Sequence, residues 1–216
     1  MSFRYLFGPF GPFIVQPDPH RGTAQMQRKS PETQFRREIH EFNREFLQLL
    51  REDAQSGAAF GLALPVRQRL RVLTPVQLEA IAETPCLLAA FAVLPPRTAS
   101  LGVADAPVRV VRAAQADAAC VFATSLLVWL WHTARQDRLL AALCIGPGRV
   151  GVEQFSSVGF RELQRTAASS VDSLEARFCR HPRLWPDLVR SACGSDLQVQ
   201  MATRLSVVQL TLISRE

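Results

Sequence analysis

"VLTPVQLEAIAETPCLLAAF", residues 72–91, has a second version later in the chain, "SVGFRELQRTAASSVDSLEARF", residues 157–178. The two stretches align when the second is shifted so that Glu162 falls on Gln77, and we call this shift (162 minus 77) the repeat offset. Self-similarity at a fixed spacing indicates an internal repeat, in which one supersecondary unit occurs twice. We therefore expect the fold to consist of two related halves.

The first of these stretches is predicted to begin as a helix. Thr74 is suited to the N-cap, Pro75 to the first helical position, and Gln77 stands three residues after the cap, which is a capping-box arrangement. Pro85 is expected to end or kink this helix, because proline lacks the N–H that a helix interior needs.

The similarity extends to both sides of the two stretches. A long amphipathic segment and a short helix precede each of them, a proline-bearing passage expected to be extended follows, and a further helix closes each copy. Four elements in the same order indicate two copies, at 33–124 and 125–216, after a flexible arm at 1–32. The corresponding segments are 46–62 and 126–145, 92–111 and 179–194, and 116–128 and 195–210.

The segment "PETQFRREIHEFNREFLQLLRED", residues 31–53, predicts a long amphipathic helix. Phe35, Ile39, Phe42 and Phe46 recur at helical spacing and form one apolar stripe, whereas charged residues occupy the opposite side. This helix is expected to bury its apolar stripe against another part of the fold.

The glycines of "RQDRLLAALCIGPGRVG", residues 135–151, have the G-x-G-x-x-G spacing that lets a backbone approach a dinucleotide pyrophosphate. That motif needs a buried strand before its first glycine. Residues 125–145 instead follow the i, i+3, i+4 pattern of a helix of about 20 residues. Gly146 and Gly148 are therefore expected to end a helix, and no nucleotide cofactor is predicted.

The composition is that of an ordinary soluble chain with a basic surplus. Of the 216 residues, 48% are hydrophobic and 20% are charged, and 25 basic residues stand against 19 acidic ones. Nearly all the basic residues are arginine, with Lys29 the only lysine, and the sequence pI is near 9.7. The surplus points to nucleic acid or an acidic partner, with a plainly solvated surface as the alternative.

Cysteine usage and the apolar runs favour a cytoplasmic location without membrane insertion. The five cysteines never form a C-x-x-C pair, so neither a disulfide framework nor a zinc knuckle is expected. Prolines break the stretch 1–20, so it does not resemble a secretion signal. The apolar run at 118–131 is too short to span a bilayer.

The sequence contains no pattern that predicts catalysis. A catalytic site needs a nucleophile, a base or a metal held in a specific frame. The histidines, His20, His40, His132 and His181, have no second metal ligand at helical or loop spacing, and no serine stands in a G-x-S-x-G motif. We expect no catalytic residues, no metal site and no cofactor, and hence a protein that is not an enzyme.

Arginines supply candidate contacts to DNA phosphates, which give affinity without sequence choice. The alternative is that these residues form the solvated surface of soluble helices. No helix presents a base-reading set of Asn, Gln and Arg, so the chain alone is not expected to read sequence. The candidates are Arg67, Arg69 and Arg71 in the first copy and Arg138, Arg149 and Arg165 in the second.

Several of these segments resemble the FlhD family, the subunit of a bacterial flagellar master regulator. "RQDRLLAALCIG" at 135–146 is similar to a helix end of that family, and "LTPVQLEAIAET" at 73–84 to its helix before a strand. The segments at 160–178 and 201–205 resemble the same helix and strand and the closing helix. FlhD proteins contain one copy, and the cysteine near their dimer axis falls here on Ala89 and Leu174, so an intersubunit disulfide is not carried over.

The resemblance implies a mainly α-helical transcriptional co-activator. Such a subunit works with an FlhC-like, zinc-bearing, DNA-reading partner, binds promoter DNA through that complex, and controls flagellar or related genes, with a higher hetero-oligomer possible. The alternative is an interaction protein without DNA function, such as an adaptor or anti-activator.

The resemblance also implies an intramolecular pseudo-dimer. FlhD-like units dimerise about a two-fold axis, and joining two of them in one chain makes the partner surface intramolecular. The helix that closes the first copy is expected to run directly into the helix that opens the second. The expected interface brings Phe42, Phe46, Leu49 and Leu50 close to Leu127, Leu130, Trp131 and Ala134.

Overall fold

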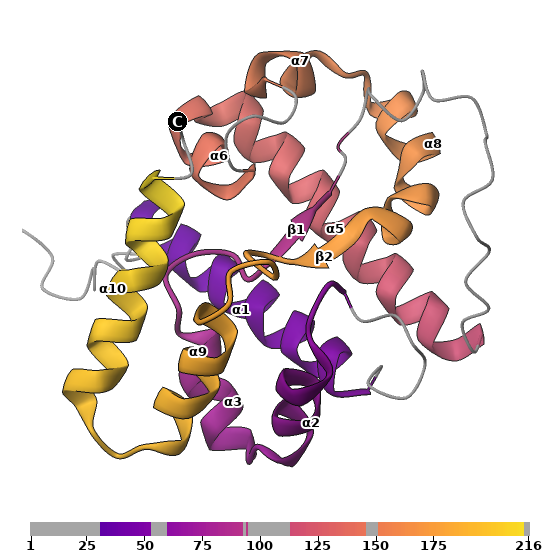
Figure 1. Ribbon diagram of the computed structural model, residues 1–216. Helices are drawn as coiled ribbons and strands as arrows, with labels where there is room; N and C mark the ends of the chain where they lie inside the picture. Colours follow the sequence, from indigo (N-terminus) through magenta and orange to yellow (C-terminus); the bar gives the residue numbers. More distant parts are fainter. Residues whose placement is uncertain (1–30, 53–59, 93, 95–112, 146–150, 214–216) are drawn as a thin grey trace, which may run out of the picture. The chain divides into compact units, whose positions relative to one another are not determined.

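The computed structural model describes residues 31–52, 60–92, 94, 113–145 and 151–213, and over these residues the chain is mainly helical, as the sequence predicts (Figure 1). The elements of the first half are α1 (Pro31–Glu52), α2 (Leu64–Val72), α3 (Pro75–Ala82) and β1 (Ala89–Phe91). Those that follow are α5 (Ala113–Gln136), α6 (Arg138–Ile145), α7 (Val152–Ser157), α8 (Phe160–Ser170), the 3-10 turn η2 (Val171–Ser173), β2 (Leu174–Ala176), α9 (Leu184–Cys193) and α10 (Leu197–Ile213).

The predicted capping box starts α3. The Thr74 hydroxyl accepts a hydrogen bond from the backbone N–H of Gln77, and the Gln77 side chain accepts one from the backbone N–H of Thr74. Two donors that the first helical turn leaves unpaired are thereby satisfied. The helix ends at Ala82, shortly before Pro85.

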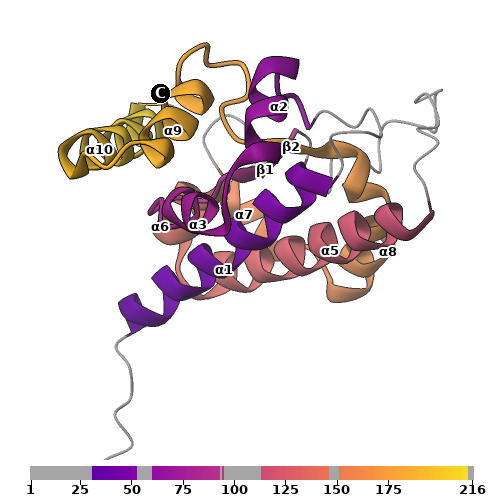
Figure 2. The same cartoon turned by 90° about the horizontal axis from the view of Figure 1, so that it is seen from below.

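Helix α5 is continuous across the point where the first copy was expected to end. It runs through residues 124 and 125 without interruption and packs against α1, α6, α7 and α8. Leu126 and Leu127 on this helix are fully buried, and they belong to one hydrophobic core to which every other described helix contributes. Figure 2 shows α1 and α5 side by side.

The described residues contain two strands, one in the earlier and one in the later part of the chain, and the two strands pair with each other. β1 and β2 are antiparallel, with Ala89 opposite Ala176 and Phe91 opposite Leu174. The ladder continues at one end, where the N–H of Ala92 donates to the carbonyl of Ser173 at 2.7 Å. Segments that lie far apart in the sequence are therefore joined by main-chain hydrogen bonds.

The structure corrects the prediction of one helix over residues 125–145. α5 ends at Gln136 and α6 begins at Arg138, so the predicted helix is interrupted at Asp137. The Asp137 carboxylate accepts hydrogen bonds from the N–H groups of Leu139 (2.9 Å) and Leu140 (3.0 Å), which starts a new helix in place of continuing the old one. Gly146 and Gly148 lie outside the described residues.

The passage 179–194, predicted to be extended, is partly helical because it contains α9. Pro186 lies in the first turn of α9, where a missing N–H costs no helical hydrogen bond. The imidazole Nδ1 of His181 accepts the N–H of Leu184 at 3.1 Å and so caps the helix from outside. Most of the corresponding passage, 92–111, lies outside the described residues.

Among the described ranges, no helix combines the length and the apolar character that crossing a bilayer requires.

Candidate functional site

An aromatic cluster joins α1 to α5. The ring of Phe42 lies 5.3 Å from that of Trp129 and 6.1 Å from that of Phe122, measured between centroids. Phe35 stacks on Trp129 at 5.5 Å, and Phe46, which is fully buried, stacks on Phe122 at 5.7 Å. Early residues of α1 meet late residues of α5, so the two helices run in opposite directions.

A polar contact fixes the orientation of Trp129 in this cluster. Its indole Nε1 donates a hydrogen bond to the carboxylate Oε2 of Glu38 at 2.8 Å. A bond to a charged acceptor is stronger than one between neutral groups. Glu38 therefore determines which way the large ring lies against Phe35 and Phe42.

Two grooves flank the cluster, one toward each end of the α1–α5 pair. The first has a volume of about 590 Å³ and is lined by Gln34 and Glu38 from α1 and by His132 from α5. The second has a volume of about 460 Å³ and is lined by residues that include Glu45 of α1 and Val121 of α5. Both are lined by carboxylates together with apolar side chains.

The residues predicted for the interface between copies are all buried or half-buried, but they do not all serve one contact. Phe42 and Phe46 lie in the aromatic cluster, and Leu50, Leu127 and Leu130 belong to the same buried core. Leu49 and Ala134 are half-buried and buried, respectively.

Trp131 serves a different contact, on the side of α5 that meets α7 and α8. Its Nε1 donates to the carbonyl of Val158 at 3.0 Å, and its ring lies 5.9 Å from that of Phe160. Phe122 and Trp129 were not among the predicted interface residues, although their spacing of two helical turns places them on one face of a helix.

The arginines predicted to contact DNA lie on separate elements. Arg67, Arg69 and Arg71 belong to α2, which packs on α1 and α9, whereas Arg165 belongs to α8, which packs on α5. Figure 1 shows α2 and α8 apart from each other. Arg138 at the start of α6 is paired with Glu153 at 2.8 Å, which offsets its charge. Arg149 lies outside the described residues.

His40 and Cys144 take part in structural contacts. His40 Nε2 and Glu79 Oε1 are 2.7 Å apart and tie α1 to α3. Burial raises the pKa of the Cys144 thiol to about 12, although the positive charge of Arg177 acts to lower this pKa. The Arg177 guanidinium donates to the carbonyls of Cys144 (3.1 Å) and Leu143 (2.7 Å) and so closes the end of α6. In the part of the chain that the structure describes, no three His, Cys, Asp or Glu residues gather as metal ligands.

Comparison of the chain with protein families, with curated proteins and with solved structures finds no match in any of the three.

Proposed function

We propose that the chain is a single-chain counterpart of an FlhD-like dimer and acts as a co-activator subunit of a transcription regulator. The observation that carries this proposal is the register of β1 and β2. Ala90 lies opposite Glu175, and the difference between these two positions (175 minus 90) equals the repeat offset (162 minus 77). The flanking pairs, Ala89–Ala176 and Phe91–Leu174, exchange with each other under that offset, as a two-fold axis through the strands requires.

The aromatic cluster supports the same axis. A shift that carries Phe42 to Trp129 (129 minus 42) also carries Phe35 to Phe122 (122 minus 35). The proposal therefore assigns the whole of α5 to the second half, although its residues up to 124 were expected in the first copy. Under this shift the contacts Phe35–Trp129 and Phe42–Phe122 exchange, and the contact Phe42–Trp129 lies at the centre. This shift exceeds the repeat offset by two positions. The reason is that the segment between the aromatic cluster and the strand is two residues longer in the first half (90 minus 42) than in the second (175 minus 129).

Burial in the short helices follows the repeat offset as well. Positions that correspond in α2–α3 and in α7–α8 are buried in both halves, which supports two copies of one unit with equivalent inner faces. The buried pairs are Leu70 and Phe155, Leu73 and Val158, and Leu78 and Leu163.

In this proposal the chain provides a scaffold and a partner provides sequence reading. The partner is an FlhC-like subunit, the DNA is a promoter of flagellar or related genes, and the compartment is the cytoplasm. The scattered arginines add phosphate contacts to the complex without selecting a base sequence.

The experiment is a gel-shift titration with a flagellar promoter fragment at two salt concentrations. The chain alone, the FlhC-like subunit alone and the two together are compared. We expect tight, sequence-specific binding only from the mixture, and weak binding by the chain alone that falls steeply with salt. Failure of the two proteins to form a complex, or specific binding by the chain alone, would overturn the proposal.

A second candidate function is an adaptor or anti-activator that does not touch DNA. The described candidate arginines are distributed over α2, α6 and α8, with Arg138 paired to Glu153, and this distribution favours it. In the same titration, this candidate predicts that the chain lowers the amount of DNA bound by its partner.

A further inference from the structure

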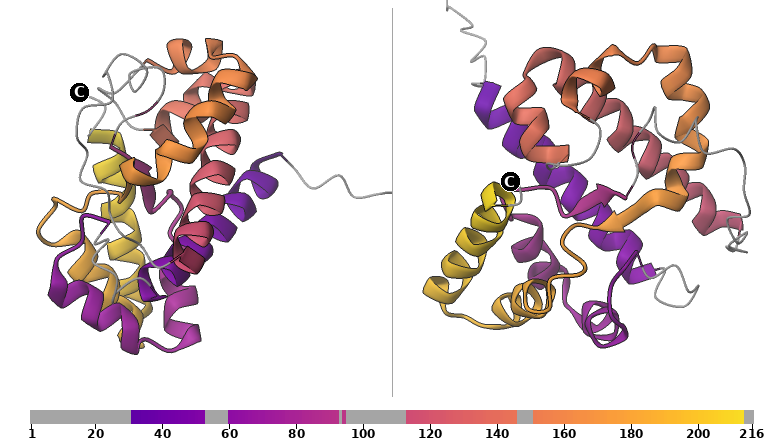
Figure 3. Two further views of the ribbon diagram at one scale, coloured as in Figure 1. Left: turned by 90° about the vertical axis from the view of Figure 1, so that its right-hand side faces the viewer. Right: turned by 45° about the horizontal axis from the view of Figure 1, so that its top comes forward.

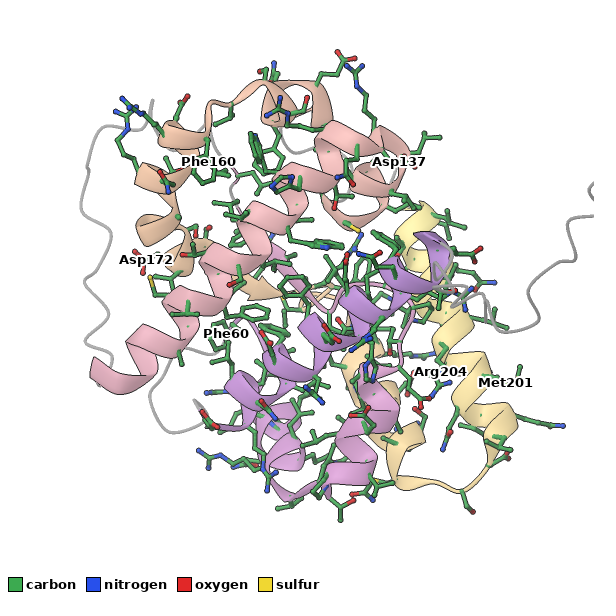
Figure 4. The ribbon with its side chains drawn as sticks, turned by 180° about the vertical axis from the view of Figure 1, so that it is seen from behind. Phe60, Asp137, Phe160, Asp172, Met201 and Arg204 are labelled. Carbon is green, nitrogen blue, oxygen red and sulfur yellow. The ribbon has the colours of Figure 1, made fainter. Side chains whose placement is uncertain are left out.

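Helix α10 is held to the rest of the fold by one side. It packs on α9, and the two helices lie side by side in Figure 3. Val207 and Thr211 are buried on that side. Arg204 reaches back to the carboxylate of Glu83 and to the carbonyl of Ala80 (3.3 Å) on and just beyond α3. Figure 4 shows Arg204 on the side of α10 nearest α3 and Met201 on the outer side.

The outer side of α10 carries a continuous row of apolar residues, here named the α10 stripe. Leu197, Met201, Leu205 and Leu212 are 71%, 62%, 60% and 48% exposed, and Val208, which is half-buried, completes the row. The steps of four, four, three and four positions keep all five on one helical face. Rows of this spacing form the seams between paired helices.

The α10 stripe is large for a surface that stays in water. Its side chains expose roughly 500 Å² of apolar area, near the largest patch of an ordinary monomer, and such patches often mark interaction sites. Two copies placed face to face would bury about 1,000 Å², which reaches the lower bound for a specific protein interface.

The charges of α10 neither select an oppositely charged partner nor repel a second copy. Arg204 is the single charged residue between Leu197 and Ile213, and it is engaged with Glu83. Recognition by this face therefore depends on apolar fit alone.

The order of the residues in the stripe makes it complementary to itself. When a second α10 runs antiparallel with Leu197 facing Leu212, Met201 faces Val208, and the two Leu205 residues lie next to each other, one position apart along the helices. Each position then meets another large apolar side chain. A two-fold contact uses the same patch on both partners, and it requires this kind of self-complementarity.

We propose that the α10 stripe is the contact between two copies of this chain, with the two α10 helices antiparallel across a two-fold axis. The two Leu205 residues lie beside the axis. The proposal does not depend on the transcriptional function, because the contact needs neither an FlhC-like partner nor DNA.

The experiment is sedimentation equilibrium of the full chain without partner or DNA over a wide concentration range. The mass of the wild type is expected to rise from 24.0 kDa toward twice that value. Leu205→Arg places two like charges against each other beside the axis, so the association constant should fall by about 100-fold or more. Leu205→Glu should act in the same way, and an equimolar mixture of the two variants should recover the dimer.

Ser206→Arg is the matched control, because Ser206 is exposed on the same helix but faces away from the stripe, and it should leave the association constant unchanged. Circular dichroism checks that every variant keeps its helical content. A wild type that remains at 24.0 kDa at all concentrations overturns the proposal. The same result is expected if residues 1–30 or another segment of the chain, and not a second copy, cover the stripe. A dimer that Leu205→Arg does not weaken, or a mixture that does not recover, also overturns it.

Discussion

Asn43 organises the path of the chain from α3 into β1. It is fully buried, its amide Nδ2 lies within hydrogen-bond distance of the carbonyls of Ala82 (3.2 Å), Thr84 (3.1 Å) and Cys86 (3.0 Å), and its Oδ1 accepts the N–H of Leu88 (2.8 Å). One side chain thus satisfies main-chain groups that would otherwise be buried without partners. Its position on α1 couples the first helix to the strand that meets the second half.

Replacement of Asn43 by leucine is expected to lower the free energy of unfolding by about 2–4 kcal/mol. Leucine has a similar volume but leaves the Leu88 N–H and the carbonyls unpaired in the core. Urea denaturation followed by circular dichroism measures the change. Gln48→Leu, at an exposed position of α1, is the control and should stay within about 0.5 kcal/mol of the wild type. A loss below about 1 kcal/mol for Asn43→Leu would show that water replaces the missing bonds.

The cysteines are expected to differ in reactivity. Because burial raises the pKa of Cys144 to about 12, almost none of this thiol is ionised at pH 8, and iodoacetamide should leave it unmodified in the folded chain. Cys193 is exposed and should be alkylated first, as mass spectrometry of the digested protein can show. Modification of Cys144 at the rate of Cys193 would contradict its burial.

The same pKa shift makes the stability depend on pH. The pKa of Cys144 is higher in the folded chain than the ordinary 9.0. The protonated thiol therefore makes its full contribution to the free energy of unfolding below about pH 9, and this contribution is lost as the pH rises toward 12. In that range the unfolded chain has already released the proton that the folded chain keeps.

At the scale of elements, Asp137 separates two helices that the apolar periodicity alone would join. Asp137→Ala removes the cap of α6 and is expected to cost about 1 kcal/mol of unfolding free energy. Asp137→Asn should retain most of the stability, because its carbonyl oxygen can accept the same N–H groups. Thermal or urea denaturation distinguishes the two, and equal losses would mean that the charge, and not the cap, matters.

Element prediction succeeded where local signals were specific. The capping residues Thr74 and Gln77 and the stripe of α1 required no knowledge of tertiary contacts. The break at Asp137 could not be predicted because the apolar spacing continues on both sides of it. Helix α9 was missed because Pro186 was interpreted as a sign of extended chain, whereas a first-turn proline is compatible with a helix.

The partners of α1 could not be predicted for a different reason. Helix α5 packs against helices on several sides, so it is apolar over most of its circumference and periodicity does not single out one face. The narrow apolar stripe of α1 identified Phe42 and Phe46 as interface residues. On α5, the apolar pattern did not distinguish Phe122 and Trp129, which contact α1, from Trp131, which contacts α7 and α8. Only the folded arrangement shows which face of α5 meets which neighbour.

At the scale of the molecule, the chain from Pro31 onward forms one compact unit, since the α1–α5 contact and the β1–β2 pair join segments that lie far apart in the sequence. Phe46→Ala is expected to lower the free energy of unfolding by about 3–5 kcal/mol, because it opens a cavity between Phe60 and Phe122. Circular dichroism and tryptophan fluorescence should report one coincident transition that moves to lower urea concentration.

Val121→Ala is the control for this variant, because Val121 is exposed on α5 and should have little effect. Two separate transitions, of which Phe46→Ala moves only one, would mean that the halves unfold independently.

The pairing of β1 with β2 has a consequence for synthesis on the ribosome. β1 begins at Ala89, but its partner strand begins only at Leu174. At ordinary translation rates the ribosome needs roughly 4–17 s to pass from the first strand to the second, and until then the nascent chain exposes an unpaired strand edge. During that time, neighbouring nascent chains on one messenger RNA present the same edge to each other. A chaperone that shields this edge would raise the yield of correctly folded protein, and slower translation after codon 91 would lower it.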